Sequence, residues 1–215
     1  MLKLYSYFRS SASFRVRIAL GLKGLPYEYV PVHLLKDGGQ QFAESYRALN
    51  ADALVPTLVD GDHALAQSMA IIEYLDETHP EPALLPGSAL DRAYIRALAQ
   101  GIACEIHPVN NLRVLKYLKH TLGVSDEAKE AWYRHWIELG FTSIEATLAR
   151  EGKAGRFCFG DTPTLADICL VPQVFNAQRF QIGLEPYPTI SRVFDACMEM
   201  PAFQQAAPKA QPDAE

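Results

Sequence analysis

Residues 2–24 read LKLYSYFRSSASFRVRIALGLKG, and this stretch decides how the first part of the chain folds. Leu2 to Tyr7 is short, aromatic and apolar, which predicts a buried strand. Ser11 to Gly24 carries apolar residues at four-residue spacing, which predicts a helix with one apolar face. Gly24 is a suitable end for that helix because glycine adopts positive φ without strain.

The turn between this strand and this helix carries Arg9 and the serines Ser10, Ser11 and Ser13. A helix N-terminus presents backbone N–H groups without helical partners and a partial positive charge. It therefore favours an anion, including a thiolate. Serine is also a preferred helix N-cap. The pattern alone leaves both interpretations open, a cap only or an anion site.

The next segments alternate strand and helix signals. We expect a strand over 27–34, a weaker helix over 40–49, a hairpin over 55–66 that turns at Asp60-Gly61, and a helix over 69–78 with Ser68 as N-cap. The order β-α-β-α-β-β-α predicts a sheet with both parallel and antiparallel pairs, covered by helices.

The character of the chain changes after a proline-containing linker at 80–90. Beyond it we expect helices over 91–122, 126–151, 164–178 and 188–199, with a capping box at Thr164–Asp167. The polar tail from Ala206 to Glu215 is expected to fray. The predicted domains are therefore a small α/β domain at 1–81 and an all-helical domain at 90–205.

Composition narrows the function classes. Hydrophobic residues make up 49% of the chain and the net charge is −5, so the chain can build a core and has no overall attraction to nucleic acid or anionic membranes. No apolar run reaches the ~18–20 residues that span a bilayer. The cysteines form no C-x-x-C pair, and the N-terminus reads as a strand rather than a signal peptide. We expect reduced thiols, no metal site and a cytoplasmic protein.

The segment Ser10–Leu20 resembles the signature of zeta-class glutathione transferases, which reads Ser-Ser-Cys, two variable positions, then Arg-Val-Arg-Ile-Ala-Leu. Further similarity lies in segments 54–58, 67–68, 70–75, 160–161 and 170–174, so the resemblance covers nearly the whole chain. It implies the glutathione transferase fold, an α/β thioredoxin-like domain that holds glutathione followed by an all-α domain that shapes the substrate pocket. It also implies a homodimer.

The resemblance assigns the catalytic role to Ser10 and Ser11. Ser11 would hydrogen-bond the glutathione sulfur, and Ser10 would be its helper or a contact to the substrate. A hydroxyl donor at a helix N-terminus stabilises a thiolate and lowers its pKa. The family's usual cysteine is Ala12 here. A mechanism that needs a protein thiolate in this turn is therefore excluded.

The resemblance also assigns the remaining cofactor contacts. Val55-Pro56 is the family's cis-proline position, and Gln67-Ser68 resembles the pair that holds the γ-glutamyl carboxylate. Without the resemblance, Pro56 would simply begin an edge strand and Ser68 would be an ordinary cap. The weaker candidates for glutathione contacts are Lys36, Gln41, His107 and Asn111.

Arg9, Arg113 and Arg179 are the candidates for substrate binding, because they match family positions and arginine binds carboxylates bidentately. The activity implied is glutathione-dependent isomerisation of maleylacetoacetate to fumarylacetoacetate, a step in aromatic amino acid breakdown. Three alternatives stay open on sequence: a maleylpyruvate isomerase, a transferase or peroxidase that consumes glutathione (for instance on small haloacids), and a non-catalytic binding module.

Overall fold

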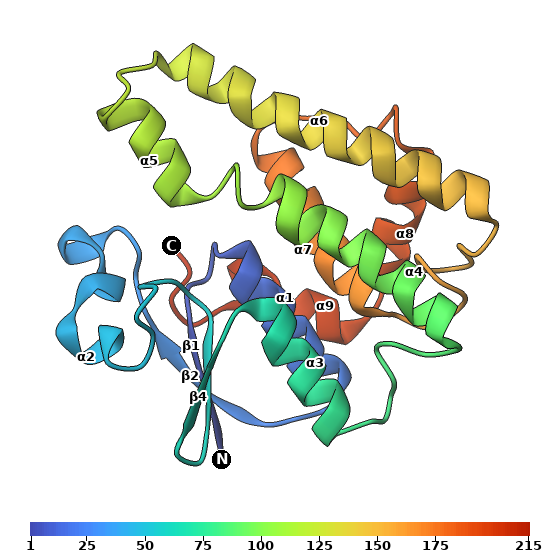
Figure 1. Ribbon diagram of the computed structural model, residues 1–215, viewed down its shortest axis with the longest axis horizontal. Helices are drawn as coiled ribbons and strands as arrows, with labels where there is room; N and C mark the ends of the chain where they lie inside the picture. The colour runs from blue at the N-terminus through green and yellow to red at the C-terminus, as the bar shows by residue number, and fades with distance from the viewer. The chain divides into compact units, whose positions relative to one another are not determined.

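The computed structural model describes residues 1–215, which divide into two compact units. The N-terminal unit consists of Met1–Ala83 together with Met198–Glu215, and the helical unit is Leu84–Cys197. Figure 1 shows the strands confined to the N-terminal unit. The expected helical domain of 90–205 differs from this grouping at its end, because the last helix packs with the N-terminal unit.

The N-terminal unit is built on a sheet of four strands in the order β2-β1-β3-β4. The strands are β1 (Leu2–Ser6), β2 (Tyr27–Pro31), β3 (Thr57–Asp60) and β4 (His63–Ala66). β1 pairs with β2 in parallel and with β3 antiparallel, and β3 and β4 form the expected hairpin. The predicted mixed sheet is confirmed.

Helices α1 (Ser11–Leu22) and α3 (Ser68–Thr78) pack together within this unit. The apolar face of α1 is buried as predicted, and Gly24 follows its end with φ 62°. The helix also buries Arg15 and Arg17, which are only 2% and 1% exposed. The sequence pattern did not predict this burial. Hydrogen bonds to residues distant in sequence explain why charged side chains are buried instead.

The weak helix expected over 40–49 is only partly formed. The connection contains the short turns η1 (Lys36–Gly38) and η2 (Gln40–Phe42) and the one-turn helix α2 (Glu44–Arg47). Ala43, between η2 and α2, has an extended backbone (φ −59°, ψ 141°), which interrupts the helix that was expected over 40–49. Val55-Pro56 is cis, as the family resemblance implied.

The helical unit contains α4 (Ala89–Gln100), a π-helical turn η3 (Gly101–Ile106), α5 (Leu112–His120), α6 (Asp126–Glu151), α7 (Leu165–Arg179) and α8 (Pro188–Met198). The single helix expected over 91–122 is wrong. Pro108 has no N–H for a helical bond. Asn111 starts a new helix by accepting the Arg113 N–H at 3.1 Å. The predicted capping box at Thr164 and Asp167 is present.

The expectation of a frayed C-terminus is also wrong. The tail follows α9 (Pro201–Ala206), which packs against α1, as Figure 1 shows, and it forms the turn η4 (Pro208–Ala210). Gln211 ties the tail to itself through the carbonyl oxygens of Gln205 and Ala207. Asp213 bonds to Phe8 and Tyr29. Hydrogen bonds of the polar residues Gln211 and Asp213 therefore hold the tail in place.

Candidate functional site

The turn before α1 is closed by a hydrogen bond from the Ser10 N–H to the Tyr7 carbonyl oxygen at 2.9 Å. Ser10 is the N-cap of the helix, and its hydroxyl oxygen accepts the Ser13 N–H at 3.2 Å. The capping interpretation is therefore confirmed for Ser10. A hydroxyl that accepts one hydrogen bond still has its own proton to donate. Capping and anion binding are thus compatible at this residue.

Ser11 is the first residue of α1 and is 8% exposed, whereas Ser10 is half-buried. The first turn of a helix holds backbone N–H groups that point along the axis without helical acceptors. A hydroxyl in that turn adds a further donor near the positive end of the helix dipole. This is the arrangement that lowers the pKa of a thiol placed beside it.

The buried Arg17 side chain holds this turn through hydrogen bonds to its backbone. Its Nη1 donates to the Tyr7 carbonyl at 3.3 Å and to the Ser6 hydroxyl at 3.0 Å, and its Nη2 donates to the Phe8 carbonyl at 3.1 Å. Burial lowers the pKa of Arg17 to about 10, so the side chain remains charged at neutral pH. Arg17, four residues after Ser13 in the motif, therefore fixes the backbone of the segment that precedes α1.

Val55 offers a backbone contact to a ligand. It lies two residues before the start of β3, and no hydrogen bond within the chain takes its N–H or C=O. Unpaired backbone groups at a strand end can pair with an extended peptide as an added strand would. This matches the contact that the resemblance implies for the cysteinyl part of glutathione.

The start of α3 differs from the expectation. Gln67, not Ser68, is the N-cap, and it adopts φ 68°, a conformation that is costly for a residue other than glycine. Ser68 is buried in the first turn, and its hydroxyl accepts a hydrogen bond from Arg15 Nη1 at 3.4 Å. Sequence reasoning missed Arg15. The only signal was a charged residue on the apolar side of α1, next to the matched serines.

Gln41 and Lys36 lie in the connection after β2. Gln41 is 5% exposed and its side-chain oxygen has no hydrogen-bond partner, so it can accept an N–H from a ligand. Lys36 is exposed, but its position is ordered by His33, whose Nδ1 accepts the Lys36 N–H at 2.9 Å. The Lys36 ammonium pairs with the Glu215 carboxylate. That bond, together with the Glu215 charge, raises the pKa of Lys36.

Replacing Glu215 with glutamine should lower the KM for glutathione by about two- to fivefold, a small change because exposed ion pairs are individually weak. The reason is that the Glu215 carboxylate holds the ammonium that a glycyl carboxylate would use. Steady-state kinetics at varied glutathione concentration would measure the change. Lys36→Gln is the matched control and should raise KM, and an unchanged KM in both variants would remove Lys36 from the site.

In the helical unit, His107 and Asn111 lie within 3.5 Å of each other through Nε2 and Nδ2. The Asn111 side-chain oxygen is already used as the N-cap of α5. Arg113, in the first turn of α5, is exposed and has a side chain available to an anion.

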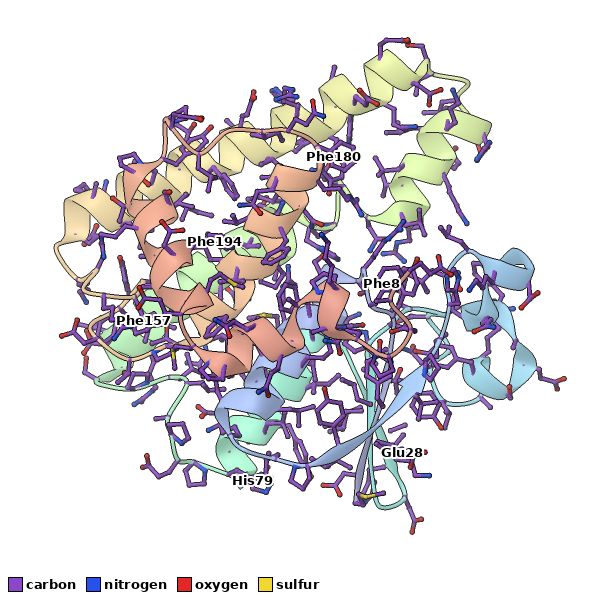
Figure 2. All side chains as sticks on the ribbon, turned by 180° about the vertical axis from the view of Figure 1, so that it is seen from behind. Phe8, Glu28, His79, Phe157, Phe180 and Phe194 are labelled. Carbon is purple, nitrogen blue, oxygen red and sulfur yellow. The ribbon has the colours of Figure 1, made fainter.

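Arg179 ends α7 and is held by aromatic residues. Its guanidinium lies 5.1 Å from the centre of the Phe180 ring, and Phe180 stacks on Tyr133 at 3.7 Å between ring centroids. Figure 2 labels Phe180 at the end of α7. Burial raises the pKa of Tyr133, while the charge and hydrogen bond of Arg179 oppose that shift. Arg179 is thus oriented by packing although its head is exposed.

The candidates fall into two groups. The N-terminal unit carries Arg9, Ser10, Ser11, Lys36, Gln41, Val55, Pro56, Gln67 and Ser68, and the helical unit carries His107, Asn111, Arg113 and Arg179. The first group lies at the ends of β1 and β2 and at the starts of β3 and α3. Of the predicted arginine clamp, Arg9 belongs to the first unit, and Arg113 and Arg179 belong to the second.

None of the four cysteines lies in the turn before α1. None of the four forms a disulfide bond, three are buried and only Cys104 is exposed. Burial raises the pKa of the Cys158 thiol, which makes it unreactive.

No group of three or more histidine, cysteine or carboxylate side chains is placed to hold a metal ion. None of the helices is both long enough and apolar enough to cross a bilayer.

Comparison with known proteins places these features in a family. Residues 4–83 match the model of the glutathione S-transferase N-terminal domain, and residues 130–196 match the model of its C-terminal domain. A probable maleylacetoacetate isomerase from Vibrio cholerae is 51% identical, covering 98% of this chain and 97% of that protein.

Solved structures agree. A holo structure of a bacterial maleylpyruvate isomerase, a zeta-class glutathione S-transferase, matches with TM-score 0.96 and 53% identity over 99% of this chain and 100% of that chain. A maleylacetoacetate isomerase from Methylobacterium extorquens AM1, solved with bound malonate and glutathione, matches with TM-score 0.95 and 39% identity over 99% of each chain. The chain belongs to the glutathione S-transferase family, among its zeta-class isomerases.

Proposed function

We propose that this protein is a glutathione-dependent cis–trans isomerase that converts maleylacetoacetate to fumarylacetoacetate. The observation that carries the proposal is the serine-capped N-terminus of α1, where hydroxyl and backbone donors converge with no protein thiol beside them. The names of the similar isomerases and the glutathione bound in one of their structures support it.

The residues present fit glutathione. The unpaired backbone of Val55 suits the cysteinyl unit, and the unpartnered buried oxygen of Gln41 can accept an amide N–H. Ser68 with the neighbouring Arg15 guanidinium offers a polar, positively charged place for the γ-glutamyl carboxylate. Lys36, which already holds a carboxylate, suits the glycyl end.

Bound glutathione supplies a thiolate, which adds to a cis double bond conjugated with a ketone, permits rotation about the former double bond and leaves again unchanged. Ser11 and the first turn of α1 hold the sulfur as an anion. Arg9 and Ser10 donate to the negative charge that develops on the ketone oxygen. Arg113 and Arg179 orient the two carboxylates of the substrate. No protein general base is needed.

The proposal is tested by following isomerisation of maleylacetoacetate by absorbance, with and without glutathione. We expect activity only with glutathione, and no loss of glutathione over many turnovers. Parallel assays with maleylpyruvate and with a small haloacid separate the alternatives. Activity without glutathione, or stoichiometric consumption of glutathione with every substrate, would contradict the isomerase assignment.

We further propose that the enzyme works as a cytoplasmic homodimer, following the family resemblance and the mostly buried cysteines, which form no disulfide bond. Light scattering behind a sizing column would measure the mass in solution. A mass equal to one 23.9 kDa chain would contradict the dimer.

Arg179→Ala should raise the KM for the dicarboxylate by about tenfold to a hundredfold, because a charged hydrogen bond contributes roughly 1.5–3 kcal/mol. The KM for an apolar electrophile should stay within about twofold, since such a substrate has no carboxylate for Arg179 to bind. Arg192→Ala is the matched control, an exposed arginine of the same unit that bonds to the Gly155 carbonyl. Equal effects on both substrates would remove Arg179 from substrate binding.

A further inference from the structure

The C-terminal tail contributes a carboxylate that holds the turn before α1. Asp213 Oδ2 accepts the backbone N–H of Phe8 at 3.1 Å, and its Oδ1 accepts the Tyr29 hydroxyl at 2.6 Å. Phe8, which is labelled in Figure 2, is 3% exposed. One side chain of the tail thus joins the turn that follows β1 to a residue of the neighbouring strand β2.

The backbone carbonyl of Phe8 is held by a residue of α1. Its carbonyl oxygen accepts from Arg17 Nη2 at 3.1 Å, while Arg17 Nε donates to the Ala206 carbonyl at 2.9 Å. The backbone of Phe8 is therefore fixed at its N–H by the tail and at its C=O by α1. The same arginine fastens the end of α9 to α1.

Asp213 and Arg17 also interact through charge. Burial lowers the pKa of Arg17, and the groups that oppose this shift are Tyr29, Tyr27 and Asp213. Burial and the bond to Asp213 raise the pKa of Tyr29. The Asp213 charge is therefore one of the groups that favour the charged form of Arg17, and both of its oxygens are engaged in hydrogen bonds.

The geometry of the turn gives this contact a functional consequence. Tyr7 and Ser10 are its ends and Phe8 and Arg9 its centre, because the Ser10 N–H bonds to the Tyr7 carbonyl. The orientation of the Phe8 peptide therefore sets the direction of Arg9 and the position of the Ser10 cap. Displacements of about 1 Å at a reacting group can lower a rate by about a hundredfold.

We propose that Asp213 is a positioning residue for the sulfur site, which acts by holding Phe8 and so placing Arg9, Ser10 and Ser11. This rests on the proposed function, that is, on glutathione binding at the start of α1. It assigns a role in the site to a tail that lies far from it in sequence.

The test compares Asp213→Ala with Gln211→Ala. Gln211 stabilises the same tail through two hydrogen bonds, and both of these go to Gln205 and Ala207, which lie outside the turn. In full-length protein, Asp213→Ala should raise the KM for glutathione by about tenfold. It should also raise the pKa of the bound thiol, followed by ultraviolet absorbance of the thiolate, by about one pH unit. Gln211→Ala should change thermal stability only. Asp213→Asn keeps one acceptor oxygen and should give a KM and a thiol pKa between those of wild type and Asp213→Ala. It provides a second test if Asp213→Ala does not fold.

If wild-type protein binds glutathione and Asp213→Ala matches Gln211→Ala in both KM and thiol pKa, Asp213 has no positioning role and the proposed function stands. The positioning role is also excluded if Asp213→Asn is folded and indistinguishable from wild type while Asp213→Ala loses activity only in proportion to unfolding. If wild-type protein does not bind glutathione, the proposed function and this inference fail together.

Discussion

Ser11→Ala should lower kcat/KM by about a hundredfold, because removing one donor to an anionic reacting atom costs on the order of 10²–10³ in rate. Ser11 is the residue in the first turn of α1 whose hydroxyl is expected to face the sulfur. The loss should be in activity and not in stability, since Ser11 is not the cap. Isomerase kinetics and thermal unfolding on the same samples would separate these quantities.

Two neighbouring serines provide matched controls. Ser10→Ala removes the cap bond to Ser13 and should cost about 1 kcal/mol of stability, with less than a tenfold loss of activity. Ser13→Ala should leave activity within about twofold, because the buried Ser13 hydroxyl has no hydrogen-bond partner. A hundredfold loss for Ser10→Ala with a near-normal Ser11→Ala would reverse the assignment of the sulfur contact.

Arg17→Met should destabilise the fold more than any of the serine substitutions. It leaves the carbonyl oxygens of Phe8 and Ala206 without their donor, while the Tyr7 carbonyl keeps the Ser10 N–H. Each group left without a donor costs about 1–3 kcal/mol, so we expect a loss of about 2 kcal/mol or more. Tm should then fall by about 4–8 °C for a chain of this size.

Arg47→Met is the control for Arg17→Met, since Arg47 is exposed on α2 and surface substitutions usually change stability by less than about 0.5 kcal/mol. Hydrogen exchange would add a local readout, because faster exchange should appear in α9 and at the Phe8 amide. A folded Arg17→Met protein with unchanged Tm would contradict the role of the buried arginine as an anchor.

The periodicity of the sequence was sufficient to predict the strands, α1 and the long helix α6, whose bounds match the expected 126–151. These elements bury apolar side chains at regular spacing, so local pattern and tertiary packing agree. The family resemblance was needed for the cis bond at Val55-Pro56, because most X-Pro bonds are trans.

The buried arginines and the ordered tail share a physical cause that the sequence pattern could not predict, which is hydrogen bonding to groups distant in sequence. Arg15 is buried because it reaches Ser68 on another helix, and Arg17 because it reaches Ala206 near the chain's end. The tail is ordered because Asp213 finds donors on Phe8 and Tyr29. No local pattern encodes such partners. The start of α3 was misplaced by one residue for a different, local reason. Gln67 adopts a positive φ, which is unfavourable for residues other than glycine.

A crystal structure of this protein with glutathione would test the role of the first turn of α1 most directly. We expect the sulfur within hydrogen-bonding distance of the Ser11 hydroxyl, about 3–3.5 Å, at the opening of α1, with the backbone of Val55 paired to the cysteinyl unit. A sulfur lodged away from both Ser10 and Ser11, with the first turn of α1 facing no part of the tripeptide, would contradict that role.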